Sequence, residues 1–373
     1  MTFPAPPSVH LRPIEQILDL ARWAPSGDNT QPWRFEIVDD LHVVVHGFDT
    51  RDHCVYDLDG HPSQISIGAL IETAAIAASA HGLGMDCRRR EHSVDDKPTL
   101  DLRFSPDSSI RPSDLLAAIT TRSVQRRPLR TRPLSADEKA ALQASLAPTH
   151  GVLWLEGFDA KLRTALLMFR SAKLRLTMPE AYRVHRDVIE WNAQFSADRV
   201  PDQALGVDGA TTRLMKFVMA SWERVEFFNT FLAGTWIPRI QMDFLPALAC
   251  AGHFVIHAPK PPSTIDDYVS AGRALQRFWL TATKLGLQLQ PELTPLIFAR
   301  YARQHVQFSS TRGMSERAED VADRLCSLIG MEIAGRAAFV GRLGAGKAAS
   351  ARSLRLDALA LRFDAAGGLL RKR

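Results

Sequence analysis

Apolar and polar residues follow one another along the first hundred positions in a pattern that predicts a helix, a hairpin, a second helix and a strand. Residues 13–23 carry apolar side chains at helical spacing behind a proline suited to the first turn. FEIV and LHVVV flank an Asp-Asp pair and predict a β-hairpin over 35–45. An alanine-rich helix is expected over 63–81, ended by Gly82, and TLDLRF alternates like a strand over 99–104.

The rest of the chain predicts further helices and two more strands. Ser135, followed by a glutamate three residues later, has the spacing of a helix-capping box. Residues 158–235 are expected to be mainly helical. GHFVIHA (252–258) and AAFVGR (337–342) are strand candidates, and a helix is expected over 264–285.

Two of these helical segments resemble each other. SIGALIETAAIAASAHGLG (66–84) aligns without a gap to SAGRALQRFWLTATKLGLQ (270–288), at an offset of 270 − 66 = 204 residues. Any two helices rich in Ala and Leu can be aligned, but identities at one offset that include Gly and Ser favour a duplicated unit. The identical pairs are Ser66/Ser270, Gly68/Gly272, Ala78/Ala282, Gly82/Gly286 and Leu83/Leu287.

The composition is that of an ordinary globular protein. Of 373 residues, 46% are hydrophobic and 23% are charged, which is enough to form a core. The net charge of +5 fits either a solvated basic surface or a positive cleft that attracts an anionic ligand such as a phosphorylated cofactor. The basic residues form no tract interleaved with aromatics, so nucleic acid is not an expected partner.

The four cysteines form no CxxC pair and no Cys/His cluster at metal spacing, which favours a reducing compartment and argues against a metal site. The N-terminal sequence MTFPAPPSVHLRP lacks the basic start and apolar core of a signal peptide. The most apolar stretch, 244–258, is too short to span a bilayer. We therefore expect a soluble, cytoplasmic protein without a membrane partner.

The most specific string in the chain is the loop PSGDNTQPW, which follows the first helix and precedes the first strand. Its Gly and Pro residues restrict the backbone, while Ser, Asn and Gln side chains are available to a ligand. The same string could be a turn that satisfies only its own backbone. A-P-S-x-x-N-x-Q-P-W resembles a motif of the nitroreductase family of FMN enzymes. The chain is especially similar to the double-length members, the Acg-like and molybdopterin-biosynthesis-associated nitroreductase proteins.

The resemblance implies that this loop reaches across a dimer interface to the flavin. It assigns flavin contacts to Pro25, Ser26 and Asn29, and extends them to Gln31 and Trp33. It also implies an α+β fold, here with two related halves that form an intramolecular pseudo-dimer. The halves are expected at 1–115 and 116–373, with a helical insert at about 158–250.

An arginine-rich segment, RSVQRRP, follows at 122–128. Arginine clusters supply the forked cationic donors that a phosphate dianion needs, although a solvated basic linker has the same composition. The segment resembles the family's R-x-[ST]-x-[RK] motif, with Val124 in place of the usual Ser or Thr. The resemblance places Arg122 on the phosphate and Arg126 on the isoalloxazine, with Gln125 as a further partner.

Two later segments complete the expected flavin site. After the second Gly-Leu helix exit, the resemblance implies a turn past the flavin N5 edge that presents backbone N–H groups, formed by Gln290, Pro291 and Glu292. The basic tail resembles the family's C-terminal phosphate-binding arm. It contributes Arg352, Ser353 and Arg355.

These elements predict one complete site rather than two. A reciprocal site would need a second SxxNxQPW loop, but 146–154 reads LAPTHGVLW. It would also need an arginine-rich segment in the first half, where only SVHLRP (8–13) stands. We therefore expect a monomer that acts as a pseudo-dimer with one degenerate site; association into a further homodimer is left open.

Two other patterns suggest different chemistry. GRLGAGKA (341–348) nearly matches a phosphate-binding P-loop, but Ala348 lacks the hydroxyl that binds Mg²⁺. His253 and His257 lie four residues apart in a segment expected to be a strand, which would not bring them together on a metal. We expect core or interface histidines and no metal.

The resemblance implies an FMN-dependent NAD(P)H oxidoreductase with a ping-pong mechanism. Its acceptor would be a nitroaromatic, a quinone or another electrophilic small molecule. No side chain is assigned as a catalytic acid or base, because hydride transfer needs positioning and electrostatics. One alternative is a flavin-binding or sequestering protein in which the insert forms a lid over FMN. Another is a dehydrogenase that acts on a carrier-bound or peptide substrate.

Overall fold

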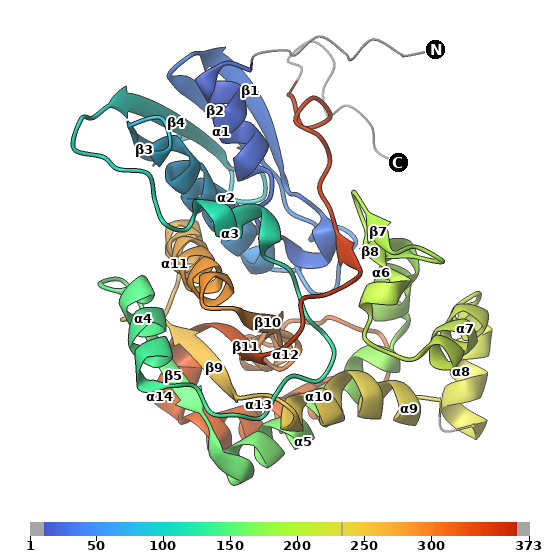
Figure 1. The fold of residues 1–373 in the computed structure, drawn as a ribbon. Coiled ribbons are helices and arrows are strands. Elements are labelled where there is room, and N and C mark those ends of the chain that lie inside the picture. The colour runs from blue at the N-terminus through green and yellow to red at the C-terminus, as the bar shows by residue number, and fades with distance from the viewer. Residues whose placement is uncertain (1–10, 233, 364–373) are drawn as a thin grey trace, which may run out of the picture.

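The structure, a computed structural model, describes residues 11–232 and 234–363. The first half carries one four-stranded sheet and the second half another, and the two lie one above the other (Figure 1). The elements of the first half are α1 (Pro13–Ala21), η1 (Gly27–Asn29), β1 (Trp33–Asp39), β2 (His42–Gly47), α2 (His61–Ser79), β3 (Leu83–Arg89) and β4 (Thr99–Pro106).

The second half is larger because helices are inserted between its strands. Its elements up to the second sheet strand are α3 (Leu116–Thr121), α4 (Ala136–Leu146), β5 (Gly151–Leu155), α5 (Gly157–Leu176), α6 (Pro179–Val188), β6 (Ile189–Glu190), β7 (Phe195–Ser196), β8 (Val200–Pro201), η2 (Asp202–Ala204), α7 (Gly209–Val218), α8 (Trp222–Phe231), α9 (Trp236–Pro238), η3 (Arg239–Phe244), α10 (Leu245–Leu248) and β9 (Gly252–His257). The remaining elements are α11 (Ile265–Lys284), β10 (Leu287–Pro291), α12 (Thr294–Arg303), α13 (Met314–Ile329), α14 (Met331–Arg336), β11 (Ala337–Ala345) and β12 (Arg352–Ser353).

The two sheets have the same strand order. The first runs β1-β2-β4-β3 and the second β5-β9-β11-β10, with every neighbouring pair antiparallel. In each half, the long helix α2 or α11 comes between the second strand and the strand that takes the far edge. This match of topology confirms the predicted α+β class and supports the predicted relation between the halves.

The two long helices form the centre of the molecule. α2 and α11 pack against each other between the sheets (Figure 1). α2 is buried along almost its whole length, because it contacts its own sheet on one side and α11 on the other. Gln276 Nε2 in α11 donates to Thr73 Oγ1 in α2 at 2.9 Å, which joins the two helices by a buried side-chain hydrogen bond. The helix contact therefore fixes the position of one half on the other.

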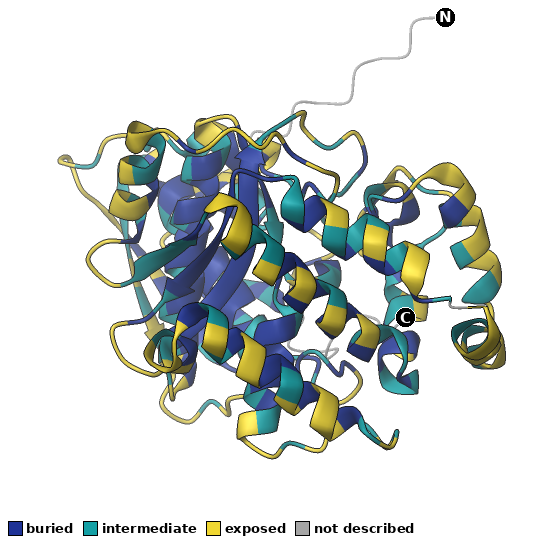
Figure 2. Cartoon of the chain, turned by 90° about the horizontal axis from the view of Figure 1, so that it is seen from below, coloured by how far each residue is buried: buried dark blue, intermediate teal, exposed yellow. Residues whose placement is uncertain are grey.

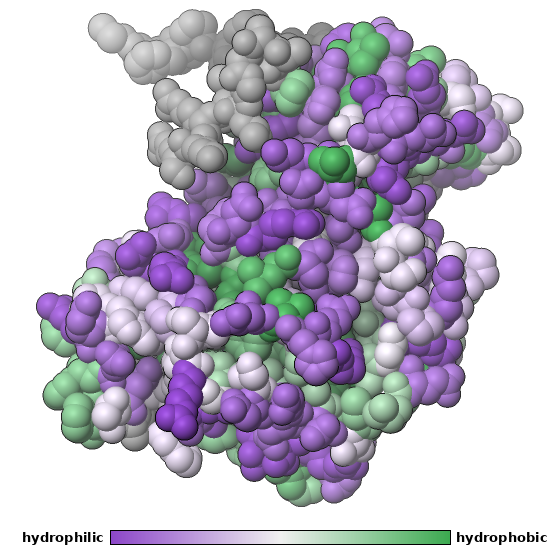
Figure 3. Space-filling view, turned by 180° about the vertical axis from the view of Figure 1, so that it is seen from behind, coloured by the Kyte–Doolittle hydropathy of each residue, from purple (hydrophilic) through white to green (hydrophobic). Residues whose placement is uncertain are grey.

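The inserted segment lies between β5 and β9, where the first half has only the tight turn between β1 and β2. Its first helix, α5, packs on α12 and α13 and belongs to the body of the second half. α7 and α8 project at the side as an arm, mostly exposed (Figures 1 and 2). The face of the molecule that points away from the viewer in Figure 1 is mainly hydrophilic. Its apolar surface gathers near the level where the two halves meet (Figure 3).

The C-terminal tail crosses from the second half back to the first. After β11 it pairs with β7 through β12, and then runs beside β1, where Phe35 N donates to Leu361 O at 2.8 Å (Figure 1). Arg22 Nη1 also donates to Leu356 O at 3.0 Å. The tail thus carries residues 352–355 into the space between the halves.

Most predicted elements are confirmed, including the hairpin, the two long helices and the capping box at Ser135 and Glu138. The segments left without a strand prediction include β3 and β5, each of which pairs along an edge of its sheet. No described helix is both long and apolar enough to cross a membrane.

Candidate functional site

A cavity of about 360 Å³ lies between the two halves. Residues of the first loop, the arginine segment, the end of β10, the inserted segment and the C-terminal tail all line it. Of the fourteen residues predicted to contact a cofactor, only Gln31, Trp33 and Gln125 are outside its lining. Segments more than three hundred residues apart in the sequence therefore meet at one site.

The loop PSGDNTQPW forms a short turn with unusual backbone geometry. Asp28, Asn29 and Gln31 all have positive φ angles, of 48°, 62° and 49°. Such angles are uncommon for residues other than glycine, and they persist where the surroundings hold them in place. Asn29 Nδ2 donates to the carbonyl oxygens of Ala197 and Arg199 in the inserted segment, at 3.1 and 3.3 Å. The inserted segment therefore holds this loop in its strained form.

Gln31 and Gln125 hold other segments in place instead of lining the cavity. Gln31 is fully buried, donates from Nε2 to Ala197 O at 2.9 Å and accepts at Oε1 from Leu356 N at 2.9 Å. Gln125 donates from Nε2 to Lys347 O at 2.8 Å. Their direct contact with a cofactor stays a prediction; in the structure these amide groups bond within the chain and position its segments.

Three arginines gather at one end of the cavity: Arg122, Arg352 and Arg355. None of them forms an ion pair with a carboxylate within residues 11–232 and 234–363. Arg122 is 3% exposed and lies over the ring of Trp279, 4.7 Å from its centroid. Burial, and then the charges of Arg355 and Arg352, lower the pKa of Arg122 well below its ordinary value.

The remaining arginine contacts in this cluster leave cationic donors free. Arg352 Nη2 donates to Arg122 O at 3.1 Å, and Arg355 Nε donates to Ala24 O at 2.9 Å. Arg122 Nε and Arg352 Nε are buried without a partner among the described residues. Burial, followed by repulsion from Arg352, lowers the pKa of Arg355 to about 9. Buried like charges without a counterion are costly, and a dianionic phosphate would neutralise them.

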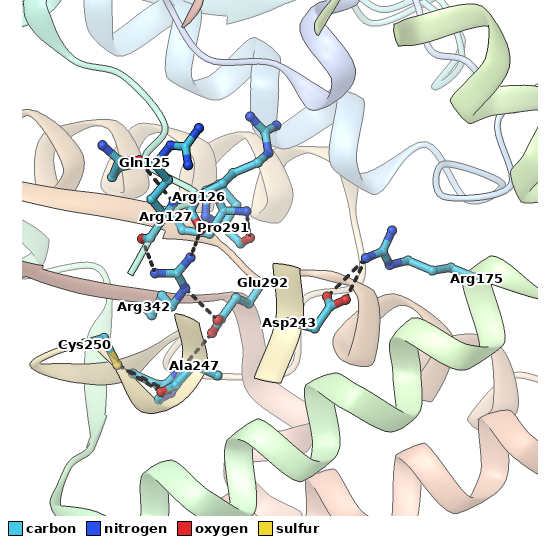
Figure 4. A network of polar contacts seen from close by, with 12 residues as sticks. Gln125, Arg126, Arg127, Arg175, Asp243, Ala247, Cys250, Pro291, Glu292 and Arg342 are labelled. Carbon is cyan, nitrogen blue, oxygen red and sulfur yellow. Dashed lines mark hydrogen bonds and ion pairs between the residues drawn. The ribbon is translucent and has the colours of Figure 1, made fainter. Parts of the chain in front are cut away.

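The other end of the cavity carries mixed charge. Arg126 donates only to Ala204 O, at 3.2 Å, among its described side-chain contacts. Arg175 forms an ion pair with Asp243, with Nη2 3.0 Å from Oδ2 (Figure 4). Burial raises the pKa of Asp28, which faces the charges of Arg126 and Arg175. Among the described residues, Arg126 thus has no carboxylate in direct contact, whereas Arg175 has Asp243.

The segment expected to form a turn beside the flavin is instead strand β10, which pairs with β11 from Leu287 to Pro291. Glu292 N donates to Val340 O at 2.8 Å, so this amide is used within the sheet. The strand forms because the residues on one face, such as Leu289, are buried against α11 and β11. Gln290 keeps an unpartnered buried Oε1 in the cavity wall.

The backbone N–H groups without a partner lie one step further along the chain. Leu293 and Thr294 begin α12, and their N–H groups donate to no atom of the described residues. The first N–H groups of a helix lack partners within the helix, so they are available to a ligand. Both residues line the cavity. The proline after Thr294, which is typical of a helix start, is the sequence signal that could have pointed to them.

Glu292 belongs to a buried ionic network (Figure 4). Its carboxylate lies 2.7 Å from His253 Nδ1 and 3.3 Å from Arg342 Nε. His253 Nε2 lies 2.9 Å from Ala247 O, which can only accept, so both ring nitrogens carry protons. Burial by itself lowers the pKa of His253, but the Glu292 carboxylate outweighs it and raises this pKa to about 10.

Arg342 connects this network to the arginine segment. Its Nη2 donates to Arg126 O at 2.8 Å and its Nη1 to Arg127 O at 3.4 Å (Figure 4). Glu292 therefore acts through Arg342 on the backbone of 126–127, in addition to lining the cavity. Sequence reasoning missed Arg342, although a single charge inside the apolar strand AAFVGR was a signal for a buried partner. His253 is confirmed as a core histidine.

A further polar pair lies in the wall between the loop and the inserted segment. Tyr56 OH and His185 Nε2 are 2.9 Å apart, and both residues line the cavity. Burial, and then the charge of Arg175, lowers the pKa of His185 to about 3. His185 is therefore neutral near pH 7, and its Nε2 shares a hydrogen bond with the Tyr56 hydroxyl.

The P-loop alternative is excluded by the backbone. Residues 341–345 continue strand β11, whereas a P-loop needs a loop that opens a helix at this point. No group of His, Cys, Asp or Glu in the described part of the chain is arranged to hold a metal ion.

The sequence model of the nitroreductase family matches residues 2–46, which include the first helix, the loop and the first hairpin. The nitroreductase resemblance is therefore confirmed; the Acg-like assignment stays a prediction. The chain is 22% identical over 305 residues to an uncharacterized protein of Mycobacterium tuberculosis, covering 79% of this chain and 41% of that protein. It thus spans about two fifths of that relative's length.

Two solved structures are similar at a low level. One is a nitroreductase with bound FMN from Bacteroides fragilis, with a TM-score of 0.34 and 12% identity, covering 70% of this chain and 94% of that one. The other is a nitroreductase-like family protein from Bacillus cereus, with a TM-score of 0.30 and 12% identity, covering 63% and 88%. Scores this low describe a distant likeness.

Proposed function

We propose that the protein is an FMN-dependent NAD(P)H oxidoreductase that passes electrons to a small electrophilic acceptor. The observation that carries the proposal is the cluster of the buried Arg122 with the half-buried Arg352 and Arg355, which has no carboxylate partner among the described residues. The family match over the adjoining loop, and FMN in the Bacteroides fragilis neighbour, make the FMN phosphate the best candidate for the missing anion. A flavin oxidoreductase is the coarser conclusion that the family supports.

The residues present fit FMN in charge and in hydrogen-bonding groups. The three arginines would hold its phosphate, and Arg126 would lie beside the isoalloxazine, where positive charge favours the reduced state. Asn29 Oδ1 and Gln290 Oε1, both buried without a partner in the described residues, would accept from ligand N–H or hydroxyl groups. The N–H groups of Leu293 and Thr294 would donate to the ring edge. The loop and the tail, which belong to different halves, would close the site.

When bound, FMN would supply two-electron transfer, in the balanced reaction NAD(P)H + H⁺ + acceptor → NAD(P)⁺ + reduced acceptor. The chain's own task would be to bind, to orient and to exclude water, so that no catalytic acid or base need be assigned. A ping-pong order follows if the reductant and the acceptor use the same open side of the cavity in turn. The two halves would act together as an intramolecular pseudo-dimer with a single site.

The proposal is tested by the absorbance spectrum of the purified chain, with flavin counted per chain, before and after anaerobic addition of NADPH or NADH. We expect one FMN per chain that bleaches and then recovers when menadione or a nitroaromatic is added. A flavin that stays oxidised would instead favour a sequestering protein. Two flavins per chain would contradict the single site, and no flavin even after reconstitution would contradict the whole proposal.

A further inference from the structure

A second cavity, of about 530 Å³, lies among the helices of the inserted segment and adjoins the candidate flavin site. We call it the insert chamber. Its size is within the range of cavities that take small organic ligands. The two cavities share seven lining residues, which form the junction between them: Asp28, Arg126, Arg175, His185, Val200, Leu205 and Met242.

The walls of the insert chamber beyond the junction are almost entirely apolar. α7 contributes Leu214, Met215 and Val218, and α8 contributes Val225 and Phe228. All four titratable residues that line the chamber lie at the junction with the flavin site. The chamber therefore offers nothing to a charged ligand except at the end that faces the site.

Apolar side chains also connect the chamber to the surface. Leu232, Trp236 and Ile237 line it, yet they are 56%, 53% and 53% exposed. Leu232 follows the last residue of α8, and Trp236 and Ile237 lie in α9. A soluble chain gains nothing from exposing several large apolar residues together, so such a group marks a place where an apolar molecule binds or enters.

We propose that the insert chamber binds the apolar tail of an amphipathic electron acceptor, whose polar reducible group lies at the junction beside Arg126. This inference rests on the proposed flavin function and specifies the acceptor that the function leaves open. The reducible group takes up two electrons and two protons, which NAD(P)H and water supply through the reaction given above. The tail lies between α7 and α8 and reaches the surface past Trp236.

The inference predicts a dependence on tail length at constant redox chemistry. The probes are 2,3-dimethoxy-5-methyl-1,4-benzoquinones with methyl, pentyl or decyl groups at position 6, which share one reducible ring. We expect KM to fall roughly tenfold or more from methyl to decyl, since each methylene buried in an apolar pocket strengthens binding. kcat should change little, because the tail is remote from the ring.

Met215→Trp tests the location, because the larger side chain would fill part of the chamber. We expect this variant to lose the dependence of KM on tail length while keeping the KM of the methyl quinone and its FMN content. Lys216→Trp is the matched control, since Lys216 is an exposed neighbour on α7 outside the chamber lining. If Met215→Trp fails to fold, Val225→Phe on α8 takes its place.

A KM that does not depend on tail length, or a dependence that Met215→Trp leaves unchanged, would overturn the inference. If no quinone is reduced although FMN is bound, the result contradicts the proposed oxidoreductase function but does not yet test the chamber. The chamber is then tested by calorimetric titration of the decyl quinone. Binding to the native chain that Met215→Trp abolishes supports the chamber, and no binding to the native chain refutes it.

Discussion

Gly68 of α2 and Gly272 of α11 meet at the point where the two long helices cross. A Cβ atom at Gly68 would lie 2.0 Å from Val269 O, and a Cβ atom at Gly272 would lie 2.0 Å from Ile65 O. The two contacts are equivalent at the offset of the repeat, since 272 − 68 = 204 and 269 − 65 = 204. Residue i contacting residue j, while their counterparts do the same, is the pattern of a two-fold interface. The two copies of the predicted repeat therefore contact each other through equivalent residues.

Adding a methyl group at either glycine should destabilise the protein. In Gly68→Ala or Gly272→Ala the new Cβ would clash with backbone, which cannot rotate away as a flexible side chain can. We expect a loss of unfolding free energy of roughly 3 kcal/mol or more, at the upper end of overpacking penalties. Urea unfolding measures it. Gly335→Ala in α14, where nothing lies within 4 Å of the added Cβ, is the control and should be close to neutral.

Removing an arginine of the phosphate cluster should weaken the binding of FMN but not that of riboflavin. Arg355→Ala is expected to weaken FMN binding roughly 10- to 100-fold, since hydrogen bonds to charged groups are worth about 1.5–3 kcal/mol. Riboflavin, which has no phosphate, should bind the variant and the native chain alike. Fluorescence titration of the apoprotein checks both, with exposed Arg88→Ala as the control. Equal loss for the two flavins would contradict a phosphate role.

Combining that change with Arg122→Ala extends the test to the buried member of the cluster. The double variant should be purified with little or no bound flavin. Because Arg122 is buried over Trp279, its removal also costs packing, so thermal unfolding must be recorded alongside. A folded double variant that stays fully yellow would refute the assignment.

The buried network around Glu292 predicts a dependence of stability on pH. The pKa of His253 is about 10 in the folded state, above its unfolded value of about 6.5. A group whose pKa is raised on folding contributes its full stabilisation below its unfolded-state pKa. It loses this contribution as the pH rises through its folded-state pKa. Unfolding free energy should therefore fall between about pH 6.5 and pH 10. Urea unfolding across this range measures the fall, and His253→Asn should flatten it.

Glu292→Gln should destabilise more than an ordinary surface change. It leaves the His253 and Arg342 cations buried without their carboxylate, for which about 3–5 kcal/mol is typical. Because Arg342 also holds the carbonyl groups of 126–127, flavin binding should weaken as well. Glu332→Gln, on an exposed glutamate, is the matched control. A small effect in both variants would mean that the network is not needed for stability.

Gln31 provides a test of positioning in contrast to direct binding. In Gln31→Glu a carboxylate oxygen replaces the amide that donates to Asn29 O and Ala197 O, so acceptors would face each other in a buried place. We expect the C-terminal tail to become sensitive to limited proteolysis, because repulsion from these carbonyl groups would displace the side chain that accepts from Leu356 N. Gln304→Glu, an exposed change, should leave the digestion pattern as it is. Unaltered protection in Gln31→Glu would contradict the positioning role.

Much of the local structure could be predicted from the sequence. The helix at residues 13–21, the first hairpin and the capping box at Ser135 depend on contacts between residues a few positions apart. The loop PSGDNTQPW and the arginine segment were identified because their composition is unusual, and the structure brings both to one cavity. The repeat identified the two helices that form the centre.

Other features depended on contacts that no local pattern encodes. β10 forms a strand instead of the expected turn because β11, some fifty residues later, pairs with it. Gln31 is a positioning residue because Leu356 and Ala197 occupy its amide. The insert chamber arises from α6 to α9, whose sequence matched nothing recognisable.

The sequence by itself therefore determined the main helices and the first hairpin, the duplicated helix and the types of group available for binding. Periodicity, capping and turn preferences act over a few residues, so a linear pattern records them. Only the tertiary structure decided that Arg122, Arg352 and Arg355 line one cavity, and that an apolar chamber adjoins it. Burial and the partners of each polar group are set by segments distant in the chain, and these determine which charges are neutralised and which stay free for a ligand.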